Sequence, residues 1–482
     1  MKNRIILVHP KLEGTHDIVY PLSCLALAAT LERENFSPVI INMEVEENYS
    51  DLAARHLDDA LFVGISAFTG LQIKYGLEFC DFVRKCNPNL PIVWGGWHPT
   101  SLPEQTTQDS RVDIVVRGEG DFVVVELAKA LQERIPLSEV KGITYKVGER
   151  VLSNVDADPI RDLNVLPPTP WHLIDIEAYI RRYRERTLCV QTGRGCAMRC
   201  RFCSHKVMPN QIPRSFSARY VFDNIEHIIR DFHITHLRFY EPTLIASRKR
   251  AVEICEEIRR RNLTITWVGG SRANVFARFD DDICTMLRQS GCVRMNFGFE
   301  SGSQWVLDRI AKKTKRDDVL RTVKKCKDHD IAVEGNFILG FPFETTGDIL
   351  DTIELILEIQ KIAPGSKICL GLYQAYPETE LYNECREKYG LPMVPTLQDW
   401  GQLPEWIDVR PWLNSRRRLF LRLARMEPNL KSYLQALDRC NVRFKWARVP
   451  LYVLALFARN ILLSVKRVSK KRGSGAEEDG GR

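Results

Sequence analysis

Short apolar runs alternate with amphipathic segments along the first 140 residues. The apolar runs have the length of β-strands and lie at 5–8, 38–42, 61–66, 91–94 and 113–117, and helical periodicity covers 22–34, 72–86 and 120–131. Continuous Val and Ile runs between helices are typical of parallel strands buried on both faces of a sheet. The pattern therefore predicts an α/β domain of the Rossmann-like (flavodoxin-like) type over residues 1–140.

A second alternation of strands and helices occupies residues 186–392. The predicted strands are 187–191, 236–240, 264–268, 293–299, 332–339 and 367–372, and the predicted helices include 218–231, 248–260, 280–290 and 346–360. Six βα units predict a partial (βα)6 barrel whose strands point their carboxyl ends at one site. The stretch 141–185 contains a cluster of prolines and is predicted to be a linker between the two domains.

Composition and cysteine usage narrow the class of protein. The chain has 482 residues, of which 44% are hydrophobic and 27% charged, as is ordinary for a soluble globular protein. Most of its 14 cysteines are scattered through the chain and do not form a disulfide framework, which favours the reducing cytoplasm. The first apolar run is too short for a signal peptide, so we expect none.

Positive charge is concentrated toward the C-terminus. Residues 410–472 contain 17 Lys and Arg against two acidic residues, whereas the whole chain has a net charge of +8. The apolar run 449–465 is interrupted by an Arg-Asn pair, so it does not predict a membrane-spanning helix. We expect a basic helical region over 393–472 that either lies on an anionic membrane surface or caps the barrel. No RNA-binding motif accompanies this charge, so nucleic acid is not an expected partner, and residues 473–482 predict a disordered tail.

Three cysteines lie within eight residues, with the spacing C-x3-C-x2-C. They are Cys196, Cys200 and Cys203. A closed zinc site needs a fourth ligand, which Cys189 or His205 would supply, but zinc sites favour two separated pairs and no second pair follows. Iron–sulfur clusters are held by thiolates in compact runs of this kind. The spacing favours a [4Fe–4S] cluster with three ligated irons and one open iron.

The motif resembles the signature of the radical S-adenosylmethionine (SAM) family, in which the open iron chelates the amino and carboxylate groups of SAM. Polar residues after the next predicted strands match further elements of that family in the same order. Taken singly, each is no more than a surface charge or turn. The resemblance assigns the amino group of SAM to Glu241, the carboxylate to Arg272, the ribose to Glu300, and further SAM contacts to Ser301 and Gly340.

Three loops with glycine or serine follow the strands of the first domain. They are Ser66-Ala67-Phe68, Gly95-Gly96-Trp97-His98-Pro99 and Gly118-Glu119-Gly120-Asp121. Alone each predicts a tight turn, but a flavodoxin-like order brings them to the sheet edge where ligands bind. Together they resemble the cobalamin (B12)-binding domain found upstream of many radical SAM domains, and the resemblance assigns cobalamin contacts to Ser66, Gly95 and Gly96. The family's Asp-x-His-x-x-Gly motif is missing near 19–24, so no histidine ligand to cobalt comes from it, and His98 is predicted to be structural.

The resemblance covers about residues 1–390 and implies a cobalamin-dependent radical SAM enzyme. Its cofactors would be a [4Fe–4S] cluster, SAM and cobalamin, with no catalytic side chain assigned beyond the cluster ligands. It implies methylation of an unactivated carbon in a small-molecule or lipid-linked biosynthetic intermediate, and an electron donor such as flavodoxin or ferredoxin. Two alternatives stay open: oxidative cyclisation of the magnesium-protoporphyrin ester type, and a non-catalytic cobalamin or Fe–S sensor. We expect a cytoplasmic protein, peripheral at the membrane if the basic region binds lipid.

Overall fold

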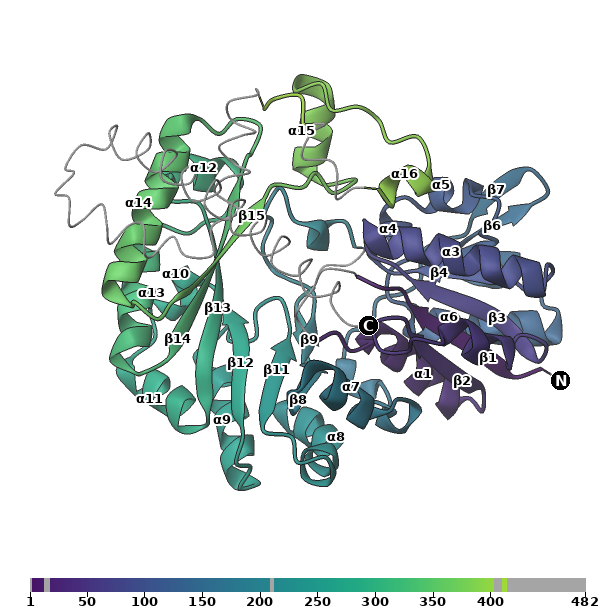
Figure 1. Cartoon of the computed structure of the whole chain (residues 1–482), viewed down its shortest axis with the longest axis horizontal. Helices are drawn as coiled ribbons and strands as arrows, with labels where there is room; N and C mark the ends of the chain where they lie inside the picture. The colour runs from purple at the N-terminus through teal and green to yellow at the C-terminus, as the bar shows by residue number, and fades with distance from the viewer. Residues whose placement is uncertain (1, 13–17, 209–211, 403–409, 414–482) are drawn as a thin grey trace, which may run out of the picture.

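Two large sheets, one mainly parallel and one fully parallel, organise the two halves of the chain (Figure 1). The computed structural model describes residues 2–12, 18–208, 212–402 and 410–413. The predicted basic helical region beyond residue 413 and the predicted tail lie outside the described residues. None of the helices in the described part of the chain combines the length and hydropathy needed to cross a membrane.

The first sheet has the strand order β2-β1-β3-β4-β5-β6-β7. Its strands are β1 (Arg4–His9), β2 (Ser37–Asn42), β3 (Ala60–Ser66), β4 (Ile92–Gly95), β5 (Ile114–Val116), β6 (Ile143–Val147) and β7 (Arg150–Ser153). The five parallel strands β1 to β5 confirm the predicted flavodoxin-like order, and β6 and β7 add to it in antiparallel fashion. The last two strands fall where the sequence predicts a linker. Gly148, with φ of +59°, turns the chain between them, and Ile143 and Tyr145 are buried in the domain core.

Helices cover both faces of this sheet. They are α1 (Leu22–Arg33), α2 (Tyr49–Ala54), α3 (Leu71–Cys86), α4 (Trp97–Ser101), α5 (Pro103–Gln108) and α6 (Gly120–Glu133). Alternate residues of β1 serve the two faces: Ile5 and Leu7 join the core with α1 and α6, and Ile6 and Val8 join the core with α3. A strand that is buried on both faces explains the unbroken apolar run seen in the sequence.

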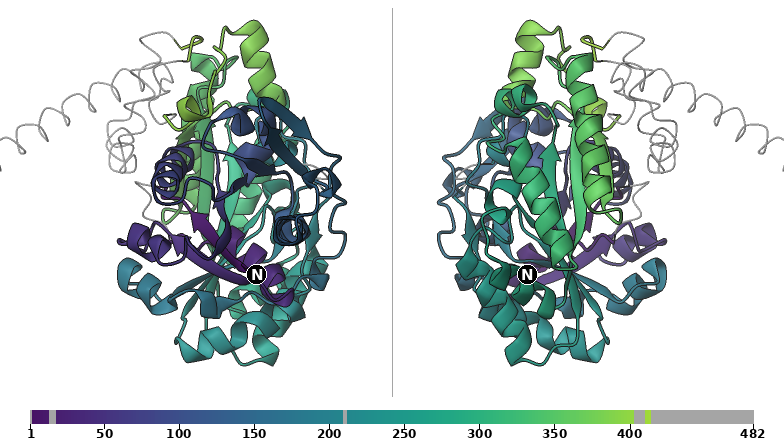
Figure 2. Two further views of the ribbon diagram at one scale, coloured as in Figure 1. Left: turned by 90° about the vertical axis from the view of Figure 1, so that its right-hand side faces the viewer. Right: turned by 90° about the vertical axis from the view of Figure 1, so that its left-hand side faces the viewer.

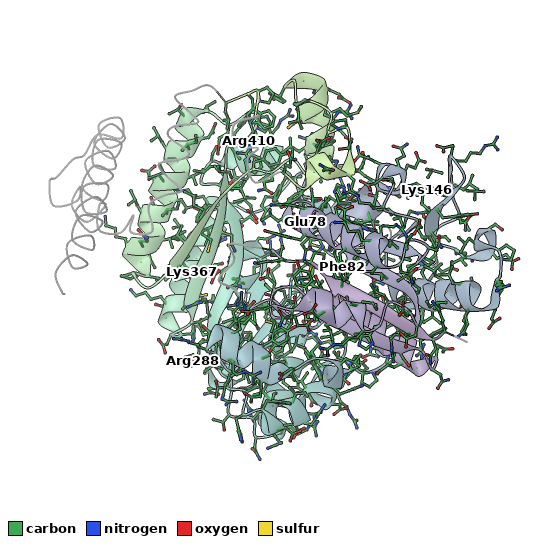
Figure 3. The ribbon with its side chains drawn as sticks, turned by 45° about the vertical axis from the view of Figure 1, so that its right-hand side comes forward. Glu78, Phe82, Lys146, Arg288, Lys367 and Arg410 are labelled. Carbon is green, nitrogen blue, oxygen red and sulfur yellow. The ribbon has the colours of Figure 1, made fainter. Side chains whose placement is uncertain are left out.

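The second sheet is a partial barrel of six parallel strands in the order β15-β14-β13-β12-β11-β8, as predicted. The strands are β8 (Thr187–Gln191), β11 (His236–Tyr240), β12 (Thr266–Ser271), β13 (Cys292–Glu300), β14 (Ala332–Leu339) and β15 (Lys367–Leu372). Lys367, labelled in Figure 3, begins β15 at one free edge of the sheet. β12 begins two residues later than the predicted 264–268 and continues through Gly269 and Gly270 to Ser271. Leu244 packs where a side chain on Gly269 would stand.

Helices cover the outer face of the barrel, where Figure 2 shows the green pair α13 and α14. The helices of this half are α8 (Ala218–Asp231), α9 (Arg248–Arg260), α10 (Ala273–Phe276), α11 (Asp281–Gln289), α12 (Gln304–Arg309), α13 (Arg316–Asp328), α14 (Thr346–Ile362), α15 (Glu380–Lys388) and α16 (Leu397–Trp400). The sequence did not predict α13, whose surface is highly charged but whose Val319, Val323 and Cys326 are buried.

The two halves share a packed interface. Tyr20 stacks on Tyr179 of α7 (Ile176–Tyr183) with ring centroids 4.3 Å apart, and its hydroxyl donates to the Thr187 carbonyl of β8 at 3.2 Å. On the other side, the Trp400 indole of α16 donates to Gln105 of α5 at 2.8 Å. These contacts join the first domain to the barrel at two separate places.

Candidate functional site

The three clustered cysteines lie in one loop that leaves β8. A two-stranded antiparallel ribbon, β9 (Gly193–Arg194) and β10 (Arg214–Ser215), closes the base of this loop. Gly195 has φ of +77°, and a side chain there would collide with the Ile212 carbonyl across the loop. Glycine is therefore required at the point where the two chain segments approach each other. We refer to residues 195–213 as the cluster loop.

The thiols of the cluster loop influence one another. Burial raises the pKa of Cys203 to about 11, and the neighbouring Cys200 and Cys196 raise it as well. Within the described residues, no three Cys, His, Asp or Glu side chains converge on a point that would hold one metal ion. A [4Fe–4S] cluster binds each thiolate on a different iron, and the mutual influence of the three thiols places them near one another, as such a cluster requires. Cys189, one fourth ligand considered for zinc, donates to the Ile18 carbonyl at 3.7 Å on the first domain.

Arg201 ties the tip of the cluster loop to α12 and α15. Its guanidinium donates to Glu380 at 2.6 Å and to the buried Glu384 at 2.7 Å, and its backbone N–H donates to the Ile310 carbonyl at 3.0 Å. The Leu381 N–H in turn donates to the Arg201 carbonyl at 3.0 Å. These contacts restrain the loop between its second and third cysteines without using a thiol.

A buried ion pair lies at the carboxyl end of β13. Glu300 has φ of +64°, and its carboxylate lies 2.7 Å from the Lys312 ammonium, with both side chains 9% exposed. Arg272, at the end of β12, donates to the Lys312 carbonyl. The Lys312 charge also favours the thiolate of Cys203, so this pair lies close to the cluster loop. Two cations and one carboxylate beside the thiols are suited to a ligand that carries both an ammonium and a carboxylate group.

The loops after β3 and β4 of the first domain also reach the cluster loop. The Phe68 ring lies 6.1 Å from Trp97 and 5.3 Å from Tyr376, and Trp97 lies 4.6 Å from His205, two residues after Cys203. Burial, and then the nearby Cys203, raises the pKa of Tyr376. The sheet edge of the first domain and the cluster loop therefore face a common space.

Known proteins identify both halves of this arrangement. The family model described as B12 binding domain matches residues 15–128, and the model of the radical SAM superfamily matches residues 190–356. The chain combines a B12-binding domain with a radical SAM domain. It is therefore a radical SAM enzyme whose cofactors are a [4Fe–4S] cluster, SAM and cobalamin.

Curated relatives extend over most of the radical SAM enzyme. An uncharacterized methyltransferase of Pyrococcus horikoshii is 28% identical, over 73% of this chain and 77% of its own. An anaerobic magnesium-protoporphyrin IX monomethyl ester cyclase of Rubrivivax gelatinosus is 26% identical, over 87% of this chain and 78% of its own.

Solved structures confirm the fold. The radical SAM methyltransferase TsrM of Kitasatospora setae has a TM-score of 0.69 at 18% identity, covering 81% of this chain and 77% of its own. The cobalamin-dependent SAM radical enzyme OxsB has a TM-score of 0.65 at 23% identity, covering 80% of this chain and 56% of its own.

The residues predicted to contact SAM fall into two groups. Arg272 and Glu300 meet at Lys312, as described above. The others already have protein partners: Ser301 bonds Thr352 at 3.1 Å, the Gly340 N–H donates to Glu344 at 2.5 Å, and Glu241 accepts from Ser215 at 2.6 Å and Thr192 at 2.9 Å. Burial raises the pKa of Glu241, whose carboxylate lies against the base of the cluster loop. Their roles in SAM binding stay predictions.

The residues predicted to contact cobalamin share one edge of the first sheet. Ser66 donates to Ser23 at 2.9 Å, the Gly95 carbonyl accepts from the Ala67 N–H at 2.9 Å, and Gly96 follows with φ of +98°. A side chain on Gly95 would meet ordinary contacts only, so the backbone there is open to close approach by a ligand. Contact of these residues with cobalamin stays a prediction.

His98 is fully buried, which agrees with its predicted structural role. Its Nδ1 lies 3.0 Å from the Thr69 hydroxyl, and its ring lies 5.4 Å from Trp400. Burial lowers the pKa of His98 to about 3, so the ring is neutral.

Lys312 and Tyr376 are the site residues that the sequence did not reveal. Lys312 belongs to the run Ala-Lys-Lys-Thr-Lys, in which nothing in the sequence distinguishes the one buried lysine from its exposed neighbours. Tyr376 follows a strand that the sequence did predict, and an aromatic residue at that strand end is the only available signal.

Proposed function

We propose that this enzyme transfers a methyl group to an unactivated carbon of a small-molecule or lipid-linked biosynthetic intermediate. Relatives named as methyltransferases support the reaction type, among them a tryptophan 2-C-methyltransferase of Streptomyces laurentii and a cytidylyl-2-hydroxyethylphosphonate methyltransferase of Streptomyces wedmorensis. The observation that carries the proposal is the series of ring contacts from Phe68 through Trp97 to His205. It joins the predicted cobalamin face to the cluster loop, and a reaction that uses both cofactors on one carbon requires this proximity.

In the proposed reaction, each group of site residues has a separate role. When bound, the cluster and SAM supply hydrogen abstraction from carbon, and cobalamin supplies the methyl group. In the proposal Cys196, Cys200 and Cys203 ligate the cluster, and the pair of Lys312 and Glu300 orients SAM beside it. The aromatic side chains that face the cluster loop keep water away from the reacting carbon.

Cyclisation without methyl transfer is the second candidate. It is favoured by the anaerobic magnesium-protoporphyrin ester cyclases among the relatives, two of which align with 87% and 94% of this chain. The third alternative, a non-catalytic sensor, is not supported, because the match to the radical SAM superfamily and the relatives named as enzymes indicate catalysis.

Anaerobic incubation with SAM and a one-electron reductant tests the proposal. We expect 5′-deoxyadenosine from the reconstituted enzyme and none above background from Cys200→Ala. S-adenosylhomocysteine formed in a cobalamin-dependent manner supports methyl transfer. Formation of 5′-deoxyadenosine without S-adenosylhomocysteine would instead favour cyclisation, and absence of both would remove the catalytic proposal.

Membrane contact through the basic region beyond residue 413 stays a prediction. The full chain is expected to sediment with anionic liposomes and a chain ending at Arg448 to sediment less. Equal sedimentation of the two would rule out this contact.

A further inference from the structure

Two arginines stand side by side at the base of the cluster loop. Arg194 of β9 and Arg214 of β10 are direct cross-strand partners in the ribbon. Like charges in this position repel each other. The ribbon is therefore stable only if negative charge is supplied to both guanidinium groups.

The first domain supplies that charge from a single turn. Asp121 receives two hydrogen bonds from Arg194, at 2.6 and 2.9 Å, and Glu119 receives two from Arg214, at 2.8 and 3.0 Å. Both carboxylates flank Gly120 at the start of α6, directly after β5. Two-pronged pairs of this kind fix orientation as well as distance. The four charges cancel, and we call these four residues the arginine clamp.

Burial distinguishes the arginine clamp from the exposed ion pairs of the molecule. The exposed fraction of the Asp121 side chain is 3%, and those of its three companions lie between 10% and 17%. Burial alone would raise the pKa of Asp121, but Arg194 outweighs it and holds the pKa below its ordinary value. The pair of Lys141 and Asp158 lies at 59% and 88% exposure, where an ion pair contributes little.

Residues of the barrel also form hydrogen bonds at the base of the cluster loop. Glu241, after β11, accepts hydrogen bonds from Thr192 and Ser215. Arg250 of α9 lies 3.7 Å from Glu241 and donates to the carbonyls of Thr192 at 3.2 Å and Phe216 at 2.8 Å. The base of the cluster loop is thus bonded both to the barrel and to the B12-binding domain.

We propose that Arg194, Arg214, Glu119 and Asp121 are positioning residues that set the distance and orientation between the cluster loop and the B12-binding domain. Contacts between domains are usually mobile, whereas a reaction that uses two cofactors on one carbon tolerates little misplacement. The inference holds for methyl transfer and for cyclisation alike, because it concerns the two cofactors and not the product.

The test compares Glu119→Gln/Asp121→Asn with the wild type, each reconstituted with cluster and cobalamin. The matched control is Asp158→Asn, which removes an exposed carboxylate from the segment that follows β7. The readout is the magnetic interaction between the reduced cluster and cob(II)alamin, measured by electron paramagnetic resonance relaxation. We expect a weaker or broader interaction in the double variant at unchanged iron and cobalamin content, and no change in the control.

Turnover gives a second, independent readout. Cleavage of SAM to 5′-deoxyadenosine depends on the cluster loop and on the SAM-contacting residues of the barrel, none of which is changed, and should persist in the double variant. Product formation per 5′-deoxyadenosine should fall by roughly 10- to 100-fold, as expected for a displacement of about 1 Å. The magnetic measurement needs no product, so it stays informative if methyl transfer itself is the wrong reaction.

An unchanged magnetic interaction in the double variant would overturn the inference. Loss of cluster iron would also overturn it, because the clamp would then retain the cluster and not position it. If the double variant does not fold, Arg194→Lys and Arg214→Lys keep the charges but remove the two-pronged geometry. In those variants too, an unchanged magnetic interaction or a loss of cluster iron would overturn the inference.

Discussion

Replacing Gly96 by alanine adds a single carbon atom to the predicted cobalamin-binding face and so tests that prediction. Gly96 has φ of +98° and ψ of −164°, a backbone region that is essentially limited to glycine. An alanine Cβ there would stand 2.8 Å from the carbonyl oxygen and 3.1 Å from the nitrogen of Ala67. Both are backbone atoms, and the same carbonyl accepts the His98 N–H at 3.3 Å, so the neighbour cannot rotate away.

The expected loss of cobalamin affinity follows from the strained backbone conformation and the close contact together. The conformation alone costs about 1–3 kcal/mol for a residue other than glycine. If the loop must keep its shape to bind cobalamin, a cost near 2 kcal/mol weakens binding by roughly 30-fold. We therefore expect Gly96→Ala to raise the Kd for cobalamin by about this factor and to lower the melting temperature.

Gly95→Ala is the matched control for this loop. Its Cβ would lie 3.7 Å from the Val116 carbonyl, an ordinary contact, so its melting temperature should equal that of the wild type. Cobalamin binding is measured by absorbance titration with hydroxocobalamin. If Gly96→Ala keeps both the wild-type Kd and the wild-type melting temperature, the reasoning about this turn is wrong.

Two further predictions concern the cluster side. Lys312→Met leaves the buried Glu300 carboxylate without its cation, which should cost about 3–5 kcal/mol of stability and lower the melting temperature. The control Lys313→Met, at an exposed neighbour, should change the melting temperature little. An equal drop in melting temperature in both variants would contradict the buried ion pair. Since burial raises the pKa of Cys203 to about 11 and iron binds the thiolate, anaerobic cluster assembly should accelerate from pH 7 to pH 9. A rate of cluster absorbance growth that does not change with pH would count against a buried, protonated Cys203.

Local sequence signals account for the elements and for the cysteine loop. The apolar runs predicted the parallel strands of both sheets, because strands buried on two faces need continuous apolar side chains. They missed β6 and β7, a short antiparallel hairpin that pairs with β5 in the proline-containing stretch predicted to be a linker. The predicted end of β12 was three residues short, and Arg272 and Glu300 entered the predicted site through the family resemblance of the segments after β12 and β13.

Local sequence signals did not predict contacts between residues that lie far apart in the chain. Glu241 was predicted to bind SAM, and the structure gives its carboxylate hydrogen bonds from Ser215 and Thr192, whose proximity depends on the ribbon. Lys312 lies in a run of lysines, and only the packing of the turn after α12 buries one of them against Glu300.

The sequence by itself determined the two domains and the three cysteines, because hydrophobic periodicity and short motifs are local properties of the chain. The tertiary structure alone decided that the first domain and the cluster loop are joined at Arg194, Arg214, Glu119 and Asp121. In the sequence Glu119 and Asp121 belong to a glycine-bearing loop of the first domain, but nothing there indicates that they pair with Arg194 and Arg214. Their role arises because the turn before α6 and the ribbon, with Glu119 and Arg194 about 75 residues apart, meet in a largely buried interface where unpaired charges would be costly.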